Sequence, residues 1–159
     1  MINEILILIG LTMIPALELR ASIPYGILVL GMDWSVVFIV CILANIILGP
    51  IVYILLDKSV HLVTRIGFIG RIYDRLVERT QKRIEKYVDR YGEMGIAIFI
   101  GVPLPGSGSY SGALGAYILG LGMIKFIKAN IFGVLIAGIL VTIVTLSGNG
   151  LFDYILKII

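Results

Sequence analysis

Charged residues and cysteine are scarce in this sequence of 159 residues. Only 14% of the residues are charged, and there is one cysteine, whereas average soluble domains carry roughly 25% charged residues. A single cysteine excludes an internal disulfide framework and any cysteine-rich zinc or iron–sulfur site. The hydrophobic fraction of 59% and the mean hydropathy of +1.07 exclude a disordered chain. The composition predicts an integral membrane protein.

Motifs of the common enzyme and cofactor sites are also missing. The sequence has no P-loop, no HExxH and no Ser/His/Asp set, so we expect no enzyme activity, no cofactor and no metal. The net charge of +3 does not indicate nucleic acid, because nine of the 13 Lys and Arg residues lie between Asp57 and Glu93.

The uncharged stretches predict an all-α membrane domain over residues 1–159. Residues 34–56 are 23 residues without a charge, enough to cross a hydrocarbon core that needs about 20. Two other apolar segments are interrupted, and each is too long for one span and too short for two, which favours a re-entrant hairpin. The predicted parts are a first repeat 1–56 (hairpin 5–32, transmembrane helix 34–56), a charged connector 57–93, and a second repeat 94–159 (hairpin 94–124, transmembrane helix 129–152).

The N-terminal segment has a second interpretation. Residues 5–17 resemble the apolar region of a cleaved signal peptide. Against this, Glu4 stands where a basic residue is expected, and no small-x-small cleavage site precedes Glu18.

The two halves align with each other as an internal repeat. Ile27-Leu-Val-Leu-Gly-Met32 matches Ile118-Leu-Gly-Leu-Gly-Met123 at five of six positions with an offset of 91, and Ala44-Asn-Ile-Ile47 matches Ala129-Asn-Ile-Phe132 with an offset of 85. Chance matches are easy in such a composition, so coincidence stays open. The shared order of an interrupted segment and then an uninterrupted span favours duplication.

Charge places the connector 57–93 in the cytoplasm. If the first hairpin enters from outside, 11 Lys and Arg residues lie inside and one outside, which satisfies the positive-inside rule. The halves then have opposite orientations, an architecture typical of secondary transporters. Residues 71–93 form an amphipathic helix that either lies on the membrane surface or packs on a partner subunit. We expect a multi-pass protein of the plasma membrane that contacts membrane lipids. We also expect a homodimer, because the two hairpins and two spans of one copy can enclose only a small part of a transport pathway.

The first hairpin carries two charges at its tip, residues 15–24. Glu18 and Arg20 need partners or water in a membrane, and the flanking Pro15 and Pro24 predict an unwound peptide between them. In an extended peptide Glu18 and Arg20 share a side, whereas in a helix they face apart. Glu18 is a candidate proton site and Arg20 an anion clamp or a group that retunes Glu18. A salt bridge that only holds the hairpin is the alternative.

The second tip, residues 102–113, carries prolines, glycines and serines instead of charges. Its backbone N–H groups and serines can bind an anion or polar head, or the tip is a neutral turn packed on the first hairpin. Under the repeat, Ser109 and Ser111 stand opposite Glu18 and Arg20. Asn45 and Asn130 lie on the two spans, where they bridge helices or line a path. The further substrate-path candidates are Ser22, Pro24, Pro103, Pro105 and Ser107.

Two segments resemble a known family. Glu18-Leu-Arg-Ala-Ser-Ile-Pro-Tyr-Gly26 and Pro103-Leu-Pro-Gly-Ser-Gly-Ser-Tyr-Ser-Gly-Ala-Leu114 resemble the signature segments of the small multi-drug export protein family. That family is similar to the DedA superfamily, which implies two opposed re-entrant hairpins and proton-dependent transport or movement of lipid phosphates. The second hairpin lacks the arginine typical of DedA proteins, which weakens a phosphate-clamping role.

Three functions follow from these observations. The first is a proton-coupled exporter of a small amphiphilic molecule that uses Glu18. The second is a flippase for an anionic lipid carrier that uses Arg20 and the serine-rich tip. The third is a non-transporting membrane scaffold whose charged pair holds the fold.

Overall fold

The computed structural model describes residues 2–15, 17–64, 92–103 and 107–148. Every regular element within these ranges is a helix, so the predicted all-α class is confirmed there. The amphipathic helix predicted over 71–93 falls almost wholly outside the described residues, as do Pro105 and the end of the span predicted at 129–152.

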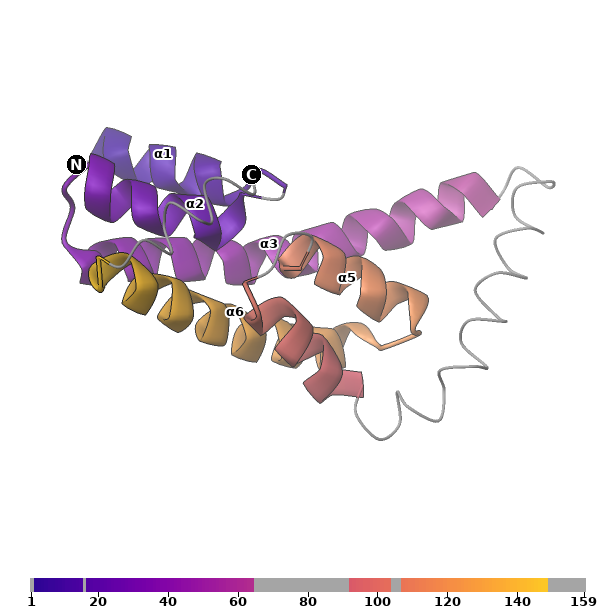
Figure 1. The fold of residues 1–159 in the computed structure, drawn as a ribbon. Coiled ribbons are helices and arrows are strands. Elements are labelled where there is room, and N and C mark those ends of the chain that lie inside the picture. Colours follow the sequence, from indigo (N-terminus) through magenta and orange to yellow (C-terminus); the bar gives the residue numbers. More distant parts are fainter. Residues whose placement is uncertain (1, 16, 65–91, 104–106, 149–159) are drawn as a thin grey trace.

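The first interrupted segment forms short helices that lie beside each other in Figure 1. Helix α1 spans Ile2–Thr12, α2 spans Glu18–Pro24, and a π-helix, η1, spans Tyr25–Val29. The turn between α1 and α2 contains Pro15, which cannot donate the backbone hydrogen bond that would continue α1.

The prediction that residues 15–24 are unwound is wrong for most of that range, because α2 is helical from Glu18 through Pro24. Pro24 removes one backbone donor, but it lies at the last position of α2, where the wider turn of η1 begins. The Tyr25 N–H points to the carbonyls of Ala21 and Ser22, and the Leu30 N–H bonds to the Tyr25 carbonyl at 3.0 Å. Local π adjustment thus re-pairs the backbone around the proline.

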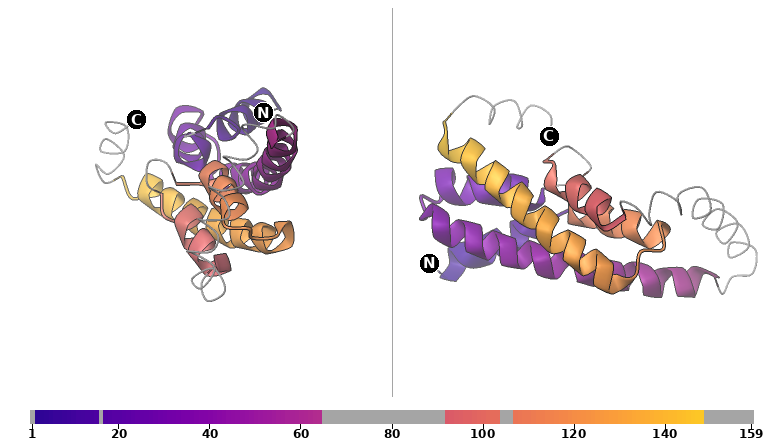
Figure 2. Two further views of the ribbon diagram at one scale, coloured as in Figure 1. Left: turned by 90° about the vertical axis from the view of Figure 1, so that its right-hand side faces the viewer. Right: turned by 90° about the horizontal axis from the view of Figure 1, so that it is seen from below.

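Two long apolar helices cross each other along the molecule (Figure 2). Helix α3 spans Trp34–Thr64 and α6 spans Met123–Leu146. Within the part of the chain that the structure describes, two segments can cross a membrane by length and composition, Trp34–Ser59 with a hydropathy of 2.7 and Met123–Leu146 with 2.4. Asp33 precedes α3, and its carboxylate accepts a hydrogen bond from the Ser35 N–H at 2.9 Å, which satisfies a free donor of the first turn.

The second interrupted segment also forms two short helices. One is Gly92–Gly101 and the other is α5, Ser109–Ile118. The first packs very closely on α6. A Cβ atom added at Gly133 would lie 2.6 Å from Ile100 and 2.7 Å from the backbone oxygen of Ala97. Glycine is therefore required at this crossing.

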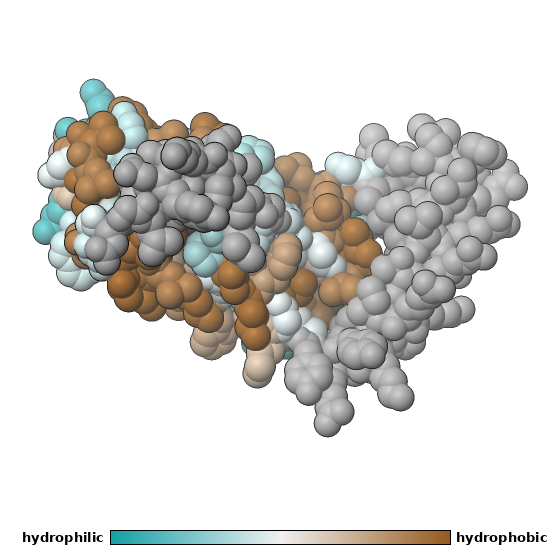
Figure 3. Space-filling view, in the orientation of Figure 1, coloured by the Kyte–Doolittle hydropathy of each residue, from teal (hydrophilic) through white to brown (hydrophobic). Residues whose placement is uncertain are grey.

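The buried core lies where α1, α2, helix Gly92–Gly101 and α5 meet the two long helices, α3 and α6. Its largest fully buried apolar side chains are Phe126, Leu8, Ile23, Val37 and Val134. The outer faces of α3 and α6 are apolar as well, and Figure 3 shows hydrophobic residues across much of the visible surface. Residues exposed by more than half include Ile39, Leu43, Ile47, Leu55, Phe132 and Ile143. Such a surface is larger than soluble monomers usually expose, and it suits lipid.

Candidate functional site

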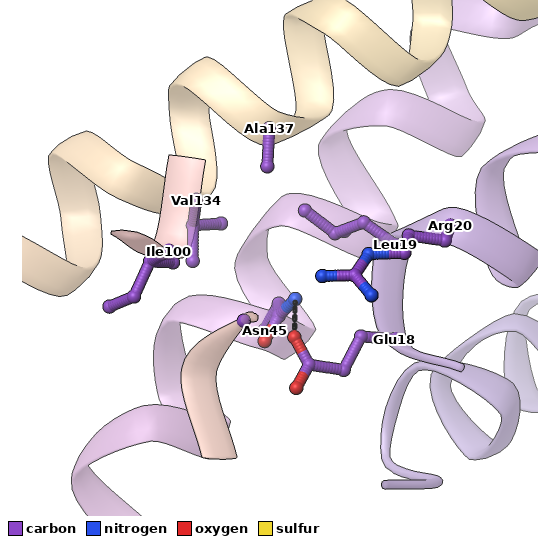
Figure 4. A pocket seen from close by; sticks show the side chains of 8 residues that line it. Glu18, Leu19, Arg20, Asn45, Ile100, Val134 and Ala137 are labelled. Atoms are coloured by element: carbon purple, nitrogen blue, oxygen red, sulfur yellow. Dashed lines mark hydrogen bonds between the residues drawn. The ribbon is translucent and has the colours of Figure 1, made fainter. Parts of the chain in front are cut away.

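The carboxylate of Glu18 lies inside the protein, where α2, α3 and α5 meet. Glu18 is 6% exposed. Its Oε2 accepts hydrogen bonds from the Ser109 backbone N–H at 3.0 Å and from Asn45 Nδ2 at 3.3 Å, and its Oε1 accepts one from the Tyr110 backbone N–H at 3.3 Å. Figure 4 shows Glu18 and Asn45 turned toward each other. One charged group therefore links three helices.

The N-terminus of α5 explains why the carboxylate lies there. The first N–H groups of a helix have no partner within the helix, and the helix dipole places partial positive charge at that end. Ser109 and Tyr110 are the first two residues of α5, so their free N–H groups meet the Glu18 carboxylate. The sequence indicated that these N–H groups could bind an anion. It did not indicate that the anion is a side chain of the same protein.

Gly108 makes room for this contact. Its φ is +124°, a conformation that side chains other than glycine rarely adopt. A Cβ atom at this position would lie 2.5 Å from Glu18 Oε2. Glycine is thus needed both for the backbone turn into α5 and for the approach of the carboxylate.

The backbone of Glu18 is strained. Its φ of +42° is the only positive φ of a non-glycine residue among the described residues, and such a conformation costs about 1–3 kcal/mol. Bonds at both ends of the residue hold it: the carboxylate bonds to α5 and α3, and the Glu18 carbonyl accepts a hydrogen bond from Ser22 Oγ at 2.9 Å. Strain of this kind clusters at functional sites.

Arg20 also bonds to the second tip. Its Nη2 donates to the Ser107 carbonyl oxygen and to Ser107 Oγ, both at 2.6 Å. The Ser107 hydroxyl in turn donates to the Val102 carbonyl. Because α2 begins at Glu18, the two charged side chains leave the helix in different directions, and both reach the second tip. Together they tie the two tips to each other.

Two pockets adjoin these charges. The first has room for about one water molecule, and its lining is Glu18, Leu19, Arg20, Asn45, Ile100, Gly108, Val134 and Ala137. The second is almost wholly apolar apart from Arg20, and its lining also includes Pro24, Pro103, Leu140, Val141, Val144 and Thr145. Arg20 borders both pockets.

The structure brings most of the other predicted site residues to the same region. Ser107 and Ser109 are buried at the contact between the tips, and Pro24 and Pro103 line the apolar pocket. Ser22 is buried within the first hairpin, where its hydroxyl donates to the Glu18 carbonyl. Ser111 is half-buried on α5. Asn130 lies apart from the charges, and its Nδ2 donates to the Ile46 carbonyl of α3 at 3.2 Å. Asn130 therefore bridges the two long helices, which was one of its two expected roles.

Sequence reasoning took Gly108 only as one of the residues that interrupt the second segment, and it missed Tyr110. The Gly-Ser-Gly-Ser pattern at 106–109 indicates a turn but not that Gly108 makes room for the Glu18 carboxylate. Tyr110 contributes its backbone N–H to Glu18, and its hydroxyl donates to the Met13 carbonyl of the turn after α1. No sequence pattern distinguishes this tyrosine from the others.

Comparison with known families decides the family of this chain. Residues 18–140, more than half of the chain, match the family described as "Putative small multi-drug export protein". The chain belongs to this family. The match begins at Glu18, so it includes the first tip from that residue onward and the whole of the second tip. Neither the search of curated proteins nor the search of solved structures found a match.

Membership of the small multi-drug export protein family agrees with the two long apolar helices, and together they show a membrane protein. The family description indicates export of small molecules. In this member of the family, Glu18 and Arg20 both lie on the first of the two segments that carried the resemblance, and both bond to the second segment, at the contact between the halves of the chain.

Proposed function

We propose that this protein is a proton-coupled exporter of small amphiphilic molecules and that Glu18 is its exchange site. The observation that carries the proposal is the position of the carboxylate. It is buried, and it accepts hydrogen bonds from α3 and α5 at the place where these helices meet α2.

A proton on Glu18 would weaken this contact. The bonds from the Ser109 and Tyr110 N–H groups to an ionised carboxylate are charge-assisted, which makes them roughly twice as strong as bonds to a neutral acceptor. Neutralisation also removes the favourable interaction with the positive end of α5. The first tip can then separate from α5 and open the pocket beside Glu18. A cationic amphiphile can replace the proton at the carboxylate, which couples proton entry to export.

The architecture that serves this function is part of the proposal. The two halves form an inverted repeat of re-entrant hairpins, as in many secondary transporters. The protein is a multi-pass protein of the plasma membrane with the connector 57–93 in the cytoplasm, and it acts as a homodimer in contact with membrane lipids. The similarity to DedA proteins, suggested by the two signature segments, supports this arrangement.

A flippase for an anionic lipid carrier is the second candidate function. The observation that favours it is the apolar pocket bordered by Arg20, Pro24 and Pro103. An acidic head group would bind the guanidinium while its hydrocarbon chain occupies the apolar side. In this case Arg20 would be the main binding group and Glu18 would govern its release.

Transport in proteoliposomes that enclose a pH-sensitive dye tests the two candidates. Lipophilic cations and polyprenyl-phosphate lipids are offered in turn to wild type, Glu18→Gln and Arg20→Lys. Asp57→Asn is the matched control, because Asp57 is an exposed carboxylate at the end of the apolar part of α3. For a cation exporter, Glu18→Gln abolishes proton movement and Arg20→Lys partly preserves it. For phosphate binding, changes at Arg20 cause the larger loss.

The scaffold alternative has its own outcome. Wild-type protein that is folded and inserted in both orientations, and that moves neither protons nor either substrate class, would contradict both transport proposals. If wild type shows no flux and the Glu18 and Arg20 variants are less stable than wild type, the two charges have a structural role only.

A further inference from the structure

Two buried amides occupy related positions on the two long helices, but only one faces a titratable group. Asn45 of α3 is 1% exposed and Asn130 of α6 is 0% exposed. The Nδ2 of Asn130 donates to a backbone carbonyl, whereas the Nδ2 of Asn45 donates to the Glu18 carboxylate. In both residues the side-chain oxygen Oδ1 is buried and has no partner among the described residues.

A carboxyl group needs different neighbours in its two protonation states. An ionised carboxylate only accepts hydrogen bonds, whereas a carboxylic acid also donates one. If Glu18 exchanges a proton in a buried pocket, the acid form needs an acceptor nearby, because a buried donor without a partner is unfavourable.

The groups around Glu18 are mostly donors. Helix α5 offers backbone N–H groups and the Tyr110 hydroxyl, which already donates to Met13. Arg20 of α2 has no acceptor atom. The parts of α6 and of helix Gly92–Gly101 in the pocket lining are apolar, namely Val134, Ala137 and Ile100. Two buried oxygens without a hydrogen-bond partner belong to residues that bond to the carboxylate, Oδ1 of Asn45 and Oγ of Ser109.

Of these two acceptors, the Asn45 amide is the better placed. Its Nδ2 is already 3.3 Å from Glu18 Oε2. Rotation of the amide by half a turn exchanges Nδ2 for Oδ1 at the same place. Because Oδ1 has no partner, this rotation breaks no hydrogen bond other than the one to Glu18.

We infer that Asn45 is a two-way partner of Glu18. It donates through Nδ2 when Glu18 is ionised, and after rotation it accepts through Oδ1 when Glu18 is protonated. Asn45 is then a positioning residue that sets the pH range in which Glu18 exchanges its proton. This inference rests on the proposed function, since it requires that Glu18 carries a proton during transport. Asn130, which bonds to a neutral carbonyl, has no such role.

Infrared difference spectroscopy of the full chain in proteoliposomes tests this inference without a transport assay. Difference spectra are recorded between acidic and neutral pH. The C=O stretch of protonated Glu18 is identified as the band that is lost in Glu18→Gln. Asn45→Leu removes the amide and keeps the number and branching of the side-chain heavy atoms, and Asn130→Leu is the matched control.

In Asn45→Leu we expect the acid band to move to higher frequency, because the acid loses its acceptor. Its midpoint should rise by about one pH unit or more, because the ionised form loses the stronger, charge-assisted bond. Asn130→Leu should leave both band and midpoint unchanged. If the wild type shows no acid band that is lost in Glu18→Gln, the proposed function is wrong. A Glu18 band that Asn45→Leu leaves unchanged, or that Asn130→Leu moves equally, would overturn only the inference about Asn45.

A second measurement uses wild-type protein, in case the Asn45 variant does not fold. The chain has four asparagines and one glutamine, so its side-chain amide resonances are few enough to assign by nuclear magnetic resonance with nitrogen-15 labelling. The Asn45 amide should shift with the same pH midpoint as the Glu18 band, and the Asn130 amide should stay constant. An Asn45 resonance that does not change with pH would contradict the inference.

Discussion

The Glu18 carboxylate accepts a hydrogen bond from the Ser109 N–H at 3.0 Å, and these two residues are 91 positions apart. The same offset aligns the two halves of the sequence in their best-matching segment. Under the predicted repeat, Glu18 thus bonds directly to the position that aligns with it in the second half. The bond needs one negative group and one free N–H group, so the two halves contribute different chemistry at the same place.

The first prediction concerns Gly108. Gly108→Ala should displace the Glu18 carboxylate, because the new Cβ atom would lie 2.5 Å from Oε2 and the φ of +124° disfavours alanine. We expect a loss of about 1–3 kcal/mol in the free energy of unfolding and a loss of transport. Denaturant titration in detergent micelles measures the first effect.

Gly95→Ala is the control for Gly108, because a Cβ atom at Gly95 meets nothing within 4 Å. It should be neutral or stabilise helix Gly92–Gly101 by up to about 1 kcal/mol. Equal effects of the two substitutions would contradict the role given to Gly108.

The second prediction concerns the bond between Arg20 and Ser107. Arg20→Met should lower the free energy of unfolding by about 2 kcal/mol, since hydrogen bonds from charged groups are worth about 1.5–3 kcal/mol. Arg20→Lys should lose less. Combined with Ser107→Ala, Arg20→Met gives a double-mutant cycle with an expected coupling of about 0.5–3 kcal/mol. Strictly additive effects would show that Arg20 gains nothing from the Ser107 hydroxyl.

The third prediction concerns the crossing of helix Gly92–Gly101 with α6. Gly133→Ala should destabilise the protein by about 1–3 kcal/mol, because its Cβ atom would lie 2.7 Å from the backbone oxygen of Ala97, and a backbone atom cannot turn aside as a side chain can. Thermal unfolding in detergent should show a lower Tm. Gly10→Ala on α1, where a Cβ atom meets nothing within 4 Å, should leave the Tm unchanged or raise it.

The fourth prediction concerns Asp33 at the start of α3. Hydrogen bonds from the Ser35 hydroxyl and then from the Ser35 backbone N–H lower the pKa of this exposed carboxyl. Its stabilising effect is therefore present above the ordinary aspartate pKa of about 3.9 and is lost as the pH falls through the lowered value. Asp33→Asn keeps the cap without the charge, so it should remove this part of the acid sensitivity. The Tm of wild type and of Asp33→Asn is measured from neutral to strongly acidic pH. The same pH dependence in both proteins would refute the stabilising role given to the Asp33 carboxylate.

The sequence by itself determined the helical class and the place of the site. Long uncharged stretches can satisfy their backbone groups in a membrane only as helices, and α3 and α6 follow from this rule. Glu18 and Arg20 were recognisable because charges inside apolar segments require partners. Prolines and glycines at 103–108 predicted where the second segment breaks, because they cannot continue a helix.

Only the tertiary structure decided which groups meet. Beside the side chains of Asn45 and Ser107, the partners of Glu18 and Arg20 are backbone atoms of Ser107, Ser109 and Tyr110. Nearly every residue of a sequence offers the same backbone N–H and carbonyl groups. Whether Pro24 ends a helix was also decided by its surroundings, since the π turn that follows it re-pairs the neighbouring carbonyls. Likewise, Asn45 and Asn130 differ in the group that each amide faces once α3 and α6 have packed. Composition and sequence spacing do not predict which group that is.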